Sequence, residues 1–424
     1  MREMKDSGVP WIGEIPKGWS LRRIGQMYKE RRTKVSDIDF KPLSVTMKGV
    51  VPQLSTAAKT DAHDDRKLVK KGDFAINSRS DRRGSCGIAP QDGSVSLINT
   101  ILCPLNETNS AYLNWLFHST LFADEFYRWG HGIVDDLWTT NWSDMKRIYI
   151  PYPSLSEQQH IADFLDTKCA EIDSILEQTK ASIEEYKKLK QSVITEAVTK
   201  GIRGNRPMKY SGVEWIGEIP VEWRVCKMKH AISVLAGYAF SSDSFTDQGV
   251  RLLRGINVTP QGLRWEETVY WNQSIDSSIE PYQLRAGDLV LGLDRPWIKE
   301  GTRVTFVNET DLPCLLLQRV CRIRPRKTSD IRFVFWVIAS NLFEEALTTD
   351  TTGISIPHIS TGQLEAFLFA LPSFSEQQEI AAYLDEKCAA IDSLISSKEA
   401  LITELEAYKK SLIYEYVTGK KEVV

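Results

Sequence analysis

Two loop segments combine side chains that can read bases or hold phosphates. Asn77-Ser78-Arg79-Ser80-Asp81-Arg82-Arg83 follows a predicted strand and brings amide, hydroxyl and guanidinium groups together. Asp294–Lys299, at the corresponding position further along the chain, contains Arg295 and Lys299. Arginine and lysine bind guanine edges or phosphates, and asparagine pairs with adenine, so both loops suit groove recognition. The open alternative for each residue is an ordinary solvated turn.

A second basic feature lies on a predicted strand. Arg322, Arg324 and Arg326 recur at every second position, which places them on one face of that strand. An ordinary charged strand face is the alternative. Together the loops and strands give the following candidate nucleic-acid contacts: Asn77, Ser78, Arg79, Arg82, Arg83, Arg295, Lys299, Arg303, Arg322 and Arg324.

The sequence lacks the motifs of an autonomous enzyme. It contains no phosphate-binding G-x-x-x-x-G-K-[ST] loop, no G-x-G-x-x-G opening a βαβ unit and no H-E-x-x-H or paired Cys/His spacing for zinc. His131, between two glycines, and His358, after a proline, are typical of turns. Cys169 and Cys388 occupy equivalent positions, which favours packing over nucleophilic attack. We therefore predict a non-catalytic chain that binds no metal.

Composition limits the compartment and the number of domains. A chain of 424 residues suggests two to three domains, and no apolar run is long enough to span a bilayer. Seven cysteines without C-x-x-C spacing favour a reduced, cytoplasmic protein that does not contact membranes. The net charge is only −3, but residues 20–152 are net basic and the segments 153–205 and 372–424 are net acidic. This distribution is expected if the segments between the acidic ones approach a polyanion.

The elements that position the loops appear twice. Ser7-Gly8-Val9-Pro10-Trp11-Ile12-Gly13-Glu14-Ile15-Pro16 returns as Ser211-Gly212-Val213-Glu214-Trp215-Ile216-Gly217-Glu218-Ile219-Pro220. Pro153-Ser154-Leu155-Ser156-Glu157-Gln158-Gln159 returns as Pro372-Ser373-Phe374-Ser375-Glu376-Gln377-Gln378, and this match continues to Val417-Thr418. Between these frames lie the first insert (20–152) and the second insert (224–371), which share little sequence. Duplication followed by drift is the alternative, but drift should erode frames and inserts alike.

The second repeated block predicts two long helices. Ser156 and Ser375 fit N-caps of the S-x-x-Q type, and neither proline nor glycine follows before Gly201 or Gly419. A helix over 156–199 would be about 66 Å long at about 1.5 Å per residue, too long to bury its apolar stripe in a small globule. The two copies should therefore pair as an antiparallel coiled coil, the alternative being two independent surface helices. The predicted packing residues are Ile161, Leu165, Ile172, Leu176, Ile183, Ile380, Leu384, Ile391, Ile395 and Ile402.

The predicted fold class is α+β, with two globular α/β domains separated by two long antiparallel helices in a pseudo-twofold internal repeat. Strands are expected in Arg251–Val258, Asp288–Leu293, Thr302–Val307 and Leu315–Ile323, and amphipathic helices near Ala111–Trp129 and Ile331–Leu347. The predicted segments are a frame segment 1–19, a first domain 20–152, a helical spacer 153–205, a repeated frame segment with the second domain 206–371, and a second spacer 372–424.

The doubled frame resembles that of the specificity subunits of type I restriction–modification systems. The resemblance rests on Ser-Gly-Val-x-Trp-Ile-Gly-Glu-Ile-Pro-x-x-Trp and Pro-Ser-(Leu/Phe)-Ser-Glu-Gln-Gln, each present twice. Gly237-Tyr238-Ala239-Phe240 and Leu253-Arg254-Gly255-Ile256-Asn257 also look like the start of that family's target recognition domains. The resemblance covers essentially the whole chain.

The resemblance implies a subunit that binds double-stranded DNA and has no chemistry of its own. Each target recognition domain would read one half of a bipartite, asymmetric site, and the helices would set the gap between the halves. Two modification subunits carrying S-adenosylmethionine would dock on the chain. Restriction subunits using ATP and Mg²⁺ would complete the nuclease.

Two rival classes predict different behaviour. A coiled-coil scaffold whose globular domains bind proteins would show no salt-sensitive DNA binding. A self-sufficient nuclease or methyltransferase would be active as the isolated chain.

Overall fold

The computed structural model describes residues 2–54, 64–79, 82–105, 108–132, 138–348 and 358–423. The chain forms two compact units, Met1–Lys180 with Glu399–Val424 and Ala181–Lys398. Each unit contains one insert, one copy of the frame segment and part of each long helix. Ser80 and Asp81 of the first loop lie outside the described residues.

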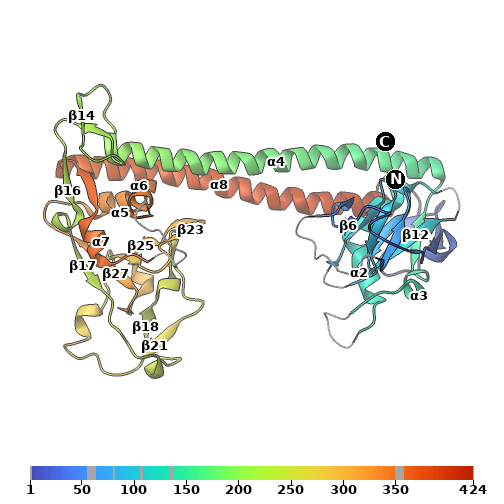
Figure 1. Ribbon diagram of the computed structural model, residues 1–424, viewed down its shortest axis with the longest axis horizontal. Coiled ribbons are helices and arrows are strands. Elements are labelled where there is room, and N and C mark those ends of the chain that lie inside the picture. The colour runs from blue at the N-terminus through green and yellow to red at the C-terminus, as the bar shows by residue number, and fades with distance from the viewer. Residues whose placement is uncertain are drawn as a thin grey trace. The chain divides into compact units, whose positions relative to one another are not determined.

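Two long helices join the parts of the repeat. Helix α4 spans Leu155–Lys200 and α8 spans Phe374–Val417, drawn in green and red in Figure 1. Their 46 and 44 residues correspond to about 69 and 66 Å at about 1.5 Å per residue. The two predicted helices are confirmed, to within one or two residues at each end.

The predicted N-caps are wrong by two residues. The backbone N–H of Glu157 donates to Ser154 Oγ, and that of Glu376 to Ser373 Oγ, both at 3.3 Å. Each block offers two serines two positions apart, and the earlier one allows a longer helix while still satisfying an end N–H. Ser156 and Ser375 therefore lie inside the first turn.

Within each unit the two helices pack antiparallel. In the first unit the rings of Phe164 and Tyr416 are 4.4 Å apart, and Lys409 Nζ donates to Asp173 at 2.5 and 2.7 Å. In the second unit Lys190 Nζ donates to Asp392 at 2.7 Å. Positions rise along α4 as their partners fall along α8, so these are not independent surface helices.

The predicted apolar stripe is largely buried. Ile395 and Ile402 are partly exposed, and Ile402 packs against the core of the first unit. The other eight predicted packing residues are buried: Ile161, Leu165, Ile172, Leu176, Ile183, Ile380, Leu384 and Ile391. The ends of the stripe, such as Leu165 and Leu384, join the core clusters of the inserts, so the helices and inserts share their cores.

Each frame segment forms a small hairpin that is tied to the start of a long helix. The hairpins are β1 (Met4–Asp6) with β2 (Glu14–Pro16) and β14 (Met208–Tyr210) with β15 (Glu218–Pro220). In the second unit Glu376 accepts from Trp223 Nε1 at 2.9 Å and from Arg206 Nη1 at 2.5 Å. Glu157 binds Trp19 Nε1 at 2.9 Å and pairs with Arg2 in the first unit. The same ion pair and indole bond therefore anchor both hairpins.

The two ends of each insert lie side by side. Strand β3 (Ser20–Arg23), which enters the first insert, pairs antiparallel with β13 (Tyr149–Tyr152), which leaves it. Strand β16 (Arg224–Lys227) pairs in the same way with β28 (Leu368–Leu371) around the second insert. Each insert is therefore closed by a two-stranded neck.

The two inserts share one strand topology although their sequences differ. The main sheets have the strand orders β10-β9-β12-β4 and β25-β22-β27-β17. In each sheet the strand that comes first along the chain (β4 or β17) pairs with the strand that comes last (β12 or β27). The first insert contains β4 (Tyr28–Glu30), β5 (Lys34–Val35), β6 (Leu43–Thr46), β7 (Gly49–Pro52), β8 (Arg66–Val69), β9 (Phe74–Asn77), β10 (Cys86–Ile88), β11 (Gly93–Ser96) and β12 (Asn99–Pro104). The second contains β17 (Ile232–Ala236), β18 (Val250–Leu253), β19 (Val258–Thr259), β20 (Gly262–Leu263), β21 (Val269–Trp271), β22 (Leu289–Gly292), β23 (Trp297–Ile298), β24 (Gly301–Thr302), β25 (Val304–Phe306), β26 (Cys314–Leu316) and β27 (Val320–Pro325).

Each predicted amphipathic helix is divided in two. The first insert has α1 (Ser110–His118), α2 (Thr120–Arg128) and α3 (Trp142–Met145); the second has α5 (Ile331–Ala339), α6 (Asn341–Thr348) and α7 (Thr361–Ala366). Ser119 and Ser340 are extended, with ψ of 140° and 153°, and their hydroxyls donate to Leu116 O and Val337 O at 2.7 Å. These serine hydroxyls bond to the last turn, which ends each helix where periodicity alone predicts continuation. In Figure 1, α5 and α6 lie between the sheet of the second insert and the long helices.

Among the described residues, none of the helices combines the length and hydrophobicity needed to cross a membrane.

Candidate nucleic-acid interface

The first predicted loop leaves the end of β9, and its first two side chains bond within the insert. Asn77 is only 8% exposed, and its Oδ1 accepts from the backbone N–H of Arg79 at 3.0 Å. The Ser78 hydroxyl donates to Ile98 O. Asn77 and Ser78 therefore shape the loop, which leaves the arginines as its outward groups.

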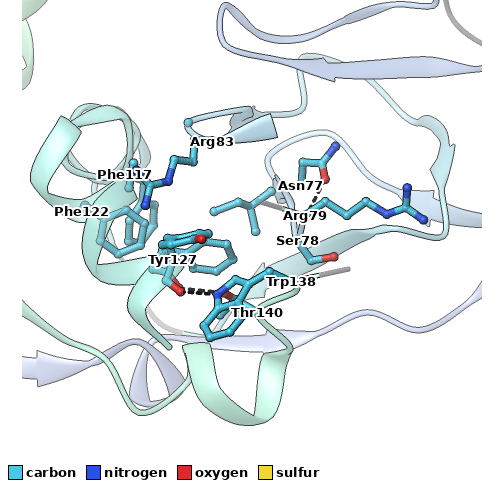
Figure 2. A pocket seen from close by; sticks show the side chains of 13 residues that line it. Asn77, Ser78, Arg79, Arg83, Phe117, Phe122, Tyr127, Trp138 and Thr140 are labelled. Carbon is cyan, nitrogen blue, oxygen red and sulfur yellow. Dashed lines mark hydrogen bonds between the residues drawn. The ribbon is translucent and has the colours of Figure 1, made fainter. Parts of the chain in front are cut away.

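The three arginines of this loop are exposed. Arg83 lies 3.9 Å from the ring centre of Tyr127, and its Nη1 donates to Asp124 at 3.1 Å. Figure 2 shows Arg83 beside the aromatic side chains and Arg79 extending away from them. The Arg79 guanidinium has no bonding partner within the described part of the chain, so it is available to an anion. Arg82 is exposed beside it.

The pocket under this loop is a packing gap and not a ligand cavity. Phe117, Phe122, Tyr127 and Trp138 line it, and Trp138 Nε1 donates to Tyr127 O at 2.9 Å (Figure 2). Its volume of about 10 Å³ is room for at most one water molecule. An extruded base would not fit, so the aromatic cluster supports the loop from below.

The second predicted loop opens onto a groove lined by arginines. The groove has a volume of about 480 Å³, and its charged lining consists of Arg254, Arg295, Arg303, Arg319 and Asp294. Arg319 Nη1 donates to Asp294 at 2.8 Å, and His358 Nδ1 lies 2.6 Å from the other carboxylate oxygen. Burial raises the pKa of Asp294, but the hydrogen bonds with His358 and Arg319 outweigh burial and hold it below its usual value. The carboxylate is therefore ionised at neutral pH.

Lys299 belongs to a different place in the second insert. It lines a depression shared with Glu184 and Lys188 of α4 and with Asn341 of α6. The structure therefore brings together Arg295 and Arg303 of the predicted set but separates Lys299 from them.

The strand arginines are bound within the insert. Arg324 forms a bidentate pair with Asp288, at 2.5 and 2.9 Å, and the Asp288 side chain is only 5% exposed. Arg322 Nη1 donates to Pro281 O at 2.8 Å, and Arg326 Nε to Lys229 O and Ile232 O at 2.9 Å. Burial lowers the pKa of Arg322. These contacts hold the insert together, so we do not carry Arg322 and Arg324 into the proposed DNA-contacting set.

The two loops occupy the same place in the shared topology. Arg79 bridges to Thr139 in the first insert, as Asp294 bridges to His358 in the second. The preceding residues also match, because Ser78 N bonds to Ile98 O and Leu293 N bonds to Arg319 O. The structure thus supports the positional correspondence inferred from sequence. At one equivalent position the first insert presents an arginine and the second an aspartate.

Arg254 and Arg319 were not among the predicted contacts. Arg254 lies in the Leu253–Asn257 stretch that carried the family resemblance, so a signal for it existed. Arg319 lies in the turn between β26 and β27, inside a segment predicted as β-rich, and nothing in its sequence neighbourhood marks it. Its position in the groove arises only from the way the strands pair.

Six of the seven cysteines are buried in this fold, and the seventh, Cys226, is partly buried. All seven cysteines are free thiols, and burial raises the pKa of Cys169 and of Cys388 to about 11, as expected for packing residues. Within the described residues, no group of three His, Cys, Asp or Glu side chains could hold a metal ion.

The two inserts have the same topology but different loop chemistry. Each is closed by a neck and attached to a repeated helical frame. This arrangement is typical of a recognition protein with two reading domains. Comparison with known proteins identifies the family. The model of the type I restriction modification DNA specificity domain matches residues 16–185 and 220–407, so the chain belongs to the family of type I restriction–modification specificity subunits and contains the specificity domain twice. These proteins recognise DNA and are not themselves catalysts.

Several relatives share this assignment. The chain is 27% identical over 424 residues to the specificity subunit of the type I restriction enzyme MjaVIII from Methanocaldococcus jannaschii, covering 96% of this chain and 94% of the relative. It is 37% identical over 171 residues to the EcoAI specificity subunit from Escherichia coli, covering 40% of this chain and 29% of the relative. The match to specificity subunits disfavours the protein-binding scaffold.

Two solved structures share the fold. A chain from the structural work on complex assembly and conformational transition of the type I R-M system has a TM-score of 0.73 at 14% identity, covering 96% of this chain and 99% of that one. The HsdS subunit from Thermoanaerobacter tengcongensis has a TM-score of 0.55 at 16% identity, covering 96% and 98%.

Proposed function

We propose that this chain reads a bipartite, asymmetric site in double-stranded DNA, with one insert for each half and the helix pair setting the gap. The observation that carries the proposal is the combination of a shared topology with different loop chemistry. Arg79 of the first insert and Asp294 of the second stand at the same position, so equivalent loops would meet different bases. The proposed contacts are Arg79, Arg82 and Arg83 in one insert and Arg295 and Arg303 in the other.

The necks support independent reading by the two inserts. Because β3 pairs with β13 and β16 with β28, each insert leaves the frame and returns to it at one place. Everything between the neck strands can differ without altering the frame. This is the arrangement expected of exchangeable recognition domains.

The surface of the long helices supports docking of modification subunits. Leu394, Leu401 and Tyr408 recur at seven-residue steps on α8 and are 46%, 41% and 54% exposed. Ile175 and Leu189 of α4 hold two of the equivalent repeat positions and are 45% and 48% exposed. Apolar side chains spaced along one helix face favour a helical partner, and the repetition favours two equivalent partners.

The cofactors of the proposed reaction belong to those partners. S-adenosylmethionine is expected on the modification subunits, and ATP with Mg²⁺ on the restriction subunits. The assembled complex would act on DNA in the cytoplasm. This chain would determine where on the DNA the partners act, and the partners would supply the reacting groups.

Exchange of one insert tests the proposal. Residues 20–152 are replaced, from the start of β3 to the end of β13, by the corresponding segment of another family member, and methylated adenines are mapped in cells that also express the modification partner. We expect one half of the methylated motif to change and the other half and the gap to persist. Exchange of residues 224–371 is the matched control and should change the opposite half. A change in both halves from a single exchange would contradict the proposal.

A further inference from the structure

Four arginines from separate segments converge on the groove of the second insert. Arg254 follows β18, Arg295 follows β22, Arg303 lies between β24 and β25, and Arg319 lies between β26 and β27. Among the described residues that line the groove, Asp294 is the one with a carboxylate. Such a concentration of like charge in a hollow of about 480 Å³ is unfavourable in the free protein and becomes favourable when an electron-rich ligand enters.

Two of these arginines have a backbone conformation that arginine rarely adopts. The φ angles are +45° for Arg295 and +68° for Arg319, and the described chain has only one other non-glycine residue with positive φ, Asn205. A left-handed backbone is strained for an L-residue, and glycine would avoid that strain. Retaining arginine at both positions indicates that their side chains are needed in the groove.

A third arginine has an unsatisfied donor. The Nε of Arg303 is buried, yet it meets no acceptor among the residues that the structure describes. Buried N–H groups without a partner are rare, so the Arg303 side chain in the groove wall is not held by a hydrogen bond of its Nε within the described residues.

Asp294 orients Arg319. One Nη of Arg319 is bound to the carboxylate, and the arginine side chain remains 70% exposed. A guanidinium fixed on one side presents its remaining donors as a planar fork, which matches the O6 and N7 acceptors on the major-groove edge of guanine. His358 binds the other oxygen of Asp294 and so limits rotation of the carboxylate.

The first insert lacks this arrangement. At the equivalent positions it has Arg79 in place of Asp294, Ile98 in place of Arg319 and Thr139 in place of His358. The Asp294–Arg319–His358 group is therefore not part of the common frame. A feature that differs between inserts of the same topology is expected to determine specificity and not general attachment to DNA.

We infer that the second insert recognises a guanine in its half-site through Arg319, with Asp294 and His358 as positioning residues and with Arg254, Arg295 and Arg303 binding the adjoining backbone or bases. This inference rests on the proposed function, because it requires that the second insert read one half-site.

The test uses the full chain assembled with its modification partner. The half-site of the second insert is identified by the insert exchange, and binding is measured to duplexes in which single guanines of that half-site are replaced by 7-deazaguanine, which lacks the N7 acceptor. For the wild-type chain we expect one replacement to weaken binding about ten-fold. Arg319→Lys, which keeps the charge but loses the planar fork, should bind both duplexes equally, and methylation mapping should show that position relaxed.

Controls separate this result from misfolding and from loss of charge. Arg264→Lys, an exposed arginine of the same insert outside the groove lining, should retain the ten-fold discrimination. Asp294→Asn should weaken discrimination while Arg319 is still present, an effect that loss of a phosphate contact would not produce. Thermal unfolding of each variant should match that of the wild type.

Three results would overturn the inference. One is a half-site of A·T pairs alone. Another is a uniform loss of affinity: if Arg319→Lys bound every duplex more weakly by the same factor, Arg319 would contact only phosphate. The third is that Arg319→Lys keeps wild-type affinity and still distinguishes guanine from 7-deazaguanine about ten-fold. If the wild-type complex showed no salt-sensitive DNA binding at all, the proposed function would fail first, which distinguishes the two failures.

Discussion

Arginine has two distinct roles in this chain, and the partner decides which role applies. Arg324 is bound to Asp288, and Arg31 is bound in the same bidentate way to Asp73, at 2.7 and 3.1 Å. The two aspartates occupy equivalent positions after a turn glycine, whereas Arg31 follows β4 and Arg324 lies on β27. Arg79 has a solvent-facing guanidinium instead. Residue type and period two could nominate Arg324 as a surface group, but its partner Asp288 is 36 positions away, directly before β22.

Removal of Arg324 should destabilise the protein. Arg324→Ala leaves the nearly buried Asp288 carboxylate without its counter-ion, and we expect the free energy of unfolding to fall by about 2–3 kcal/mol. Urea denaturation followed by tryptophan fluorescence would measure the change. Arg264→Ala, at an exposed position, should cost less than about 0.5 kcal/mol. Equal effects of the two substitutions would show that the Arg324–Asp288 pair is not structural.

At the scale of elements, long-range periodicity predicts better than local sequence does. The two long helices could be predicted because one stripe persists over more than forty residues without glycine or proline. Their caps could not, because each start offers two serines, and the breaks at Ser119 and Ser340 each depend on a single hydroxyl. Single hydrogen bonds of this kind leave no periodic signal.

The hairpin anchors differ in burial, which gives a graded prediction. Glu376 and Arg206 have side chains only 5% and 10% exposed, whereas Glu157 and Arg2 are each 24% exposed. Glu376→Ala would remove the buried counter-ion of Arg206 and the acceptor of the Trp223 indole N–H, so we expect a loss of about 3 kcal/mol in the free energy of unfolding. Glu157→Ala should cost less.

Glu222 provides the matched control for that substitution. It pairs with the same Arg206 at 3.3 Å, but its side chain is 52% exposed. Glu222→Ala should therefore cost less than about 1 kcal/mol in the same urea titration. A loss as large as that of Glu376→Ala would mean that burial does not determine the strength of these anchors.

At the scale of the whole chain, duplication explains most of what the sequence could predict. The repeated frames indicated two inserts and paired helices, and the structure confirms both. The arginine groove of the second insert could not be foreseen, because residues 254, 295, 303 and 319 meet only after four strands have paired in register. The proposed recognition groove is thus assembled from turns that are distant in sequence.

Lengthening both helices together tests the central claim, that the inserts read two half-sites at a distance set by the helix pair. Seven residues repeating the local heptad are inserted after Ala181 and after Ala400, which are equivalent positions in the two copies. The added rise is about 10 Å, which corresponds to at most about three base pairs of B-DNA.

The decisive measurement is the map of methylated adenines in cells that express this lengthened chain with its modification partner. We predict that both half-sites keep their sequences and that the gap between them grows by a fixed number of base pairs. An unchanged gap, or an altered half-site, would contradict the account.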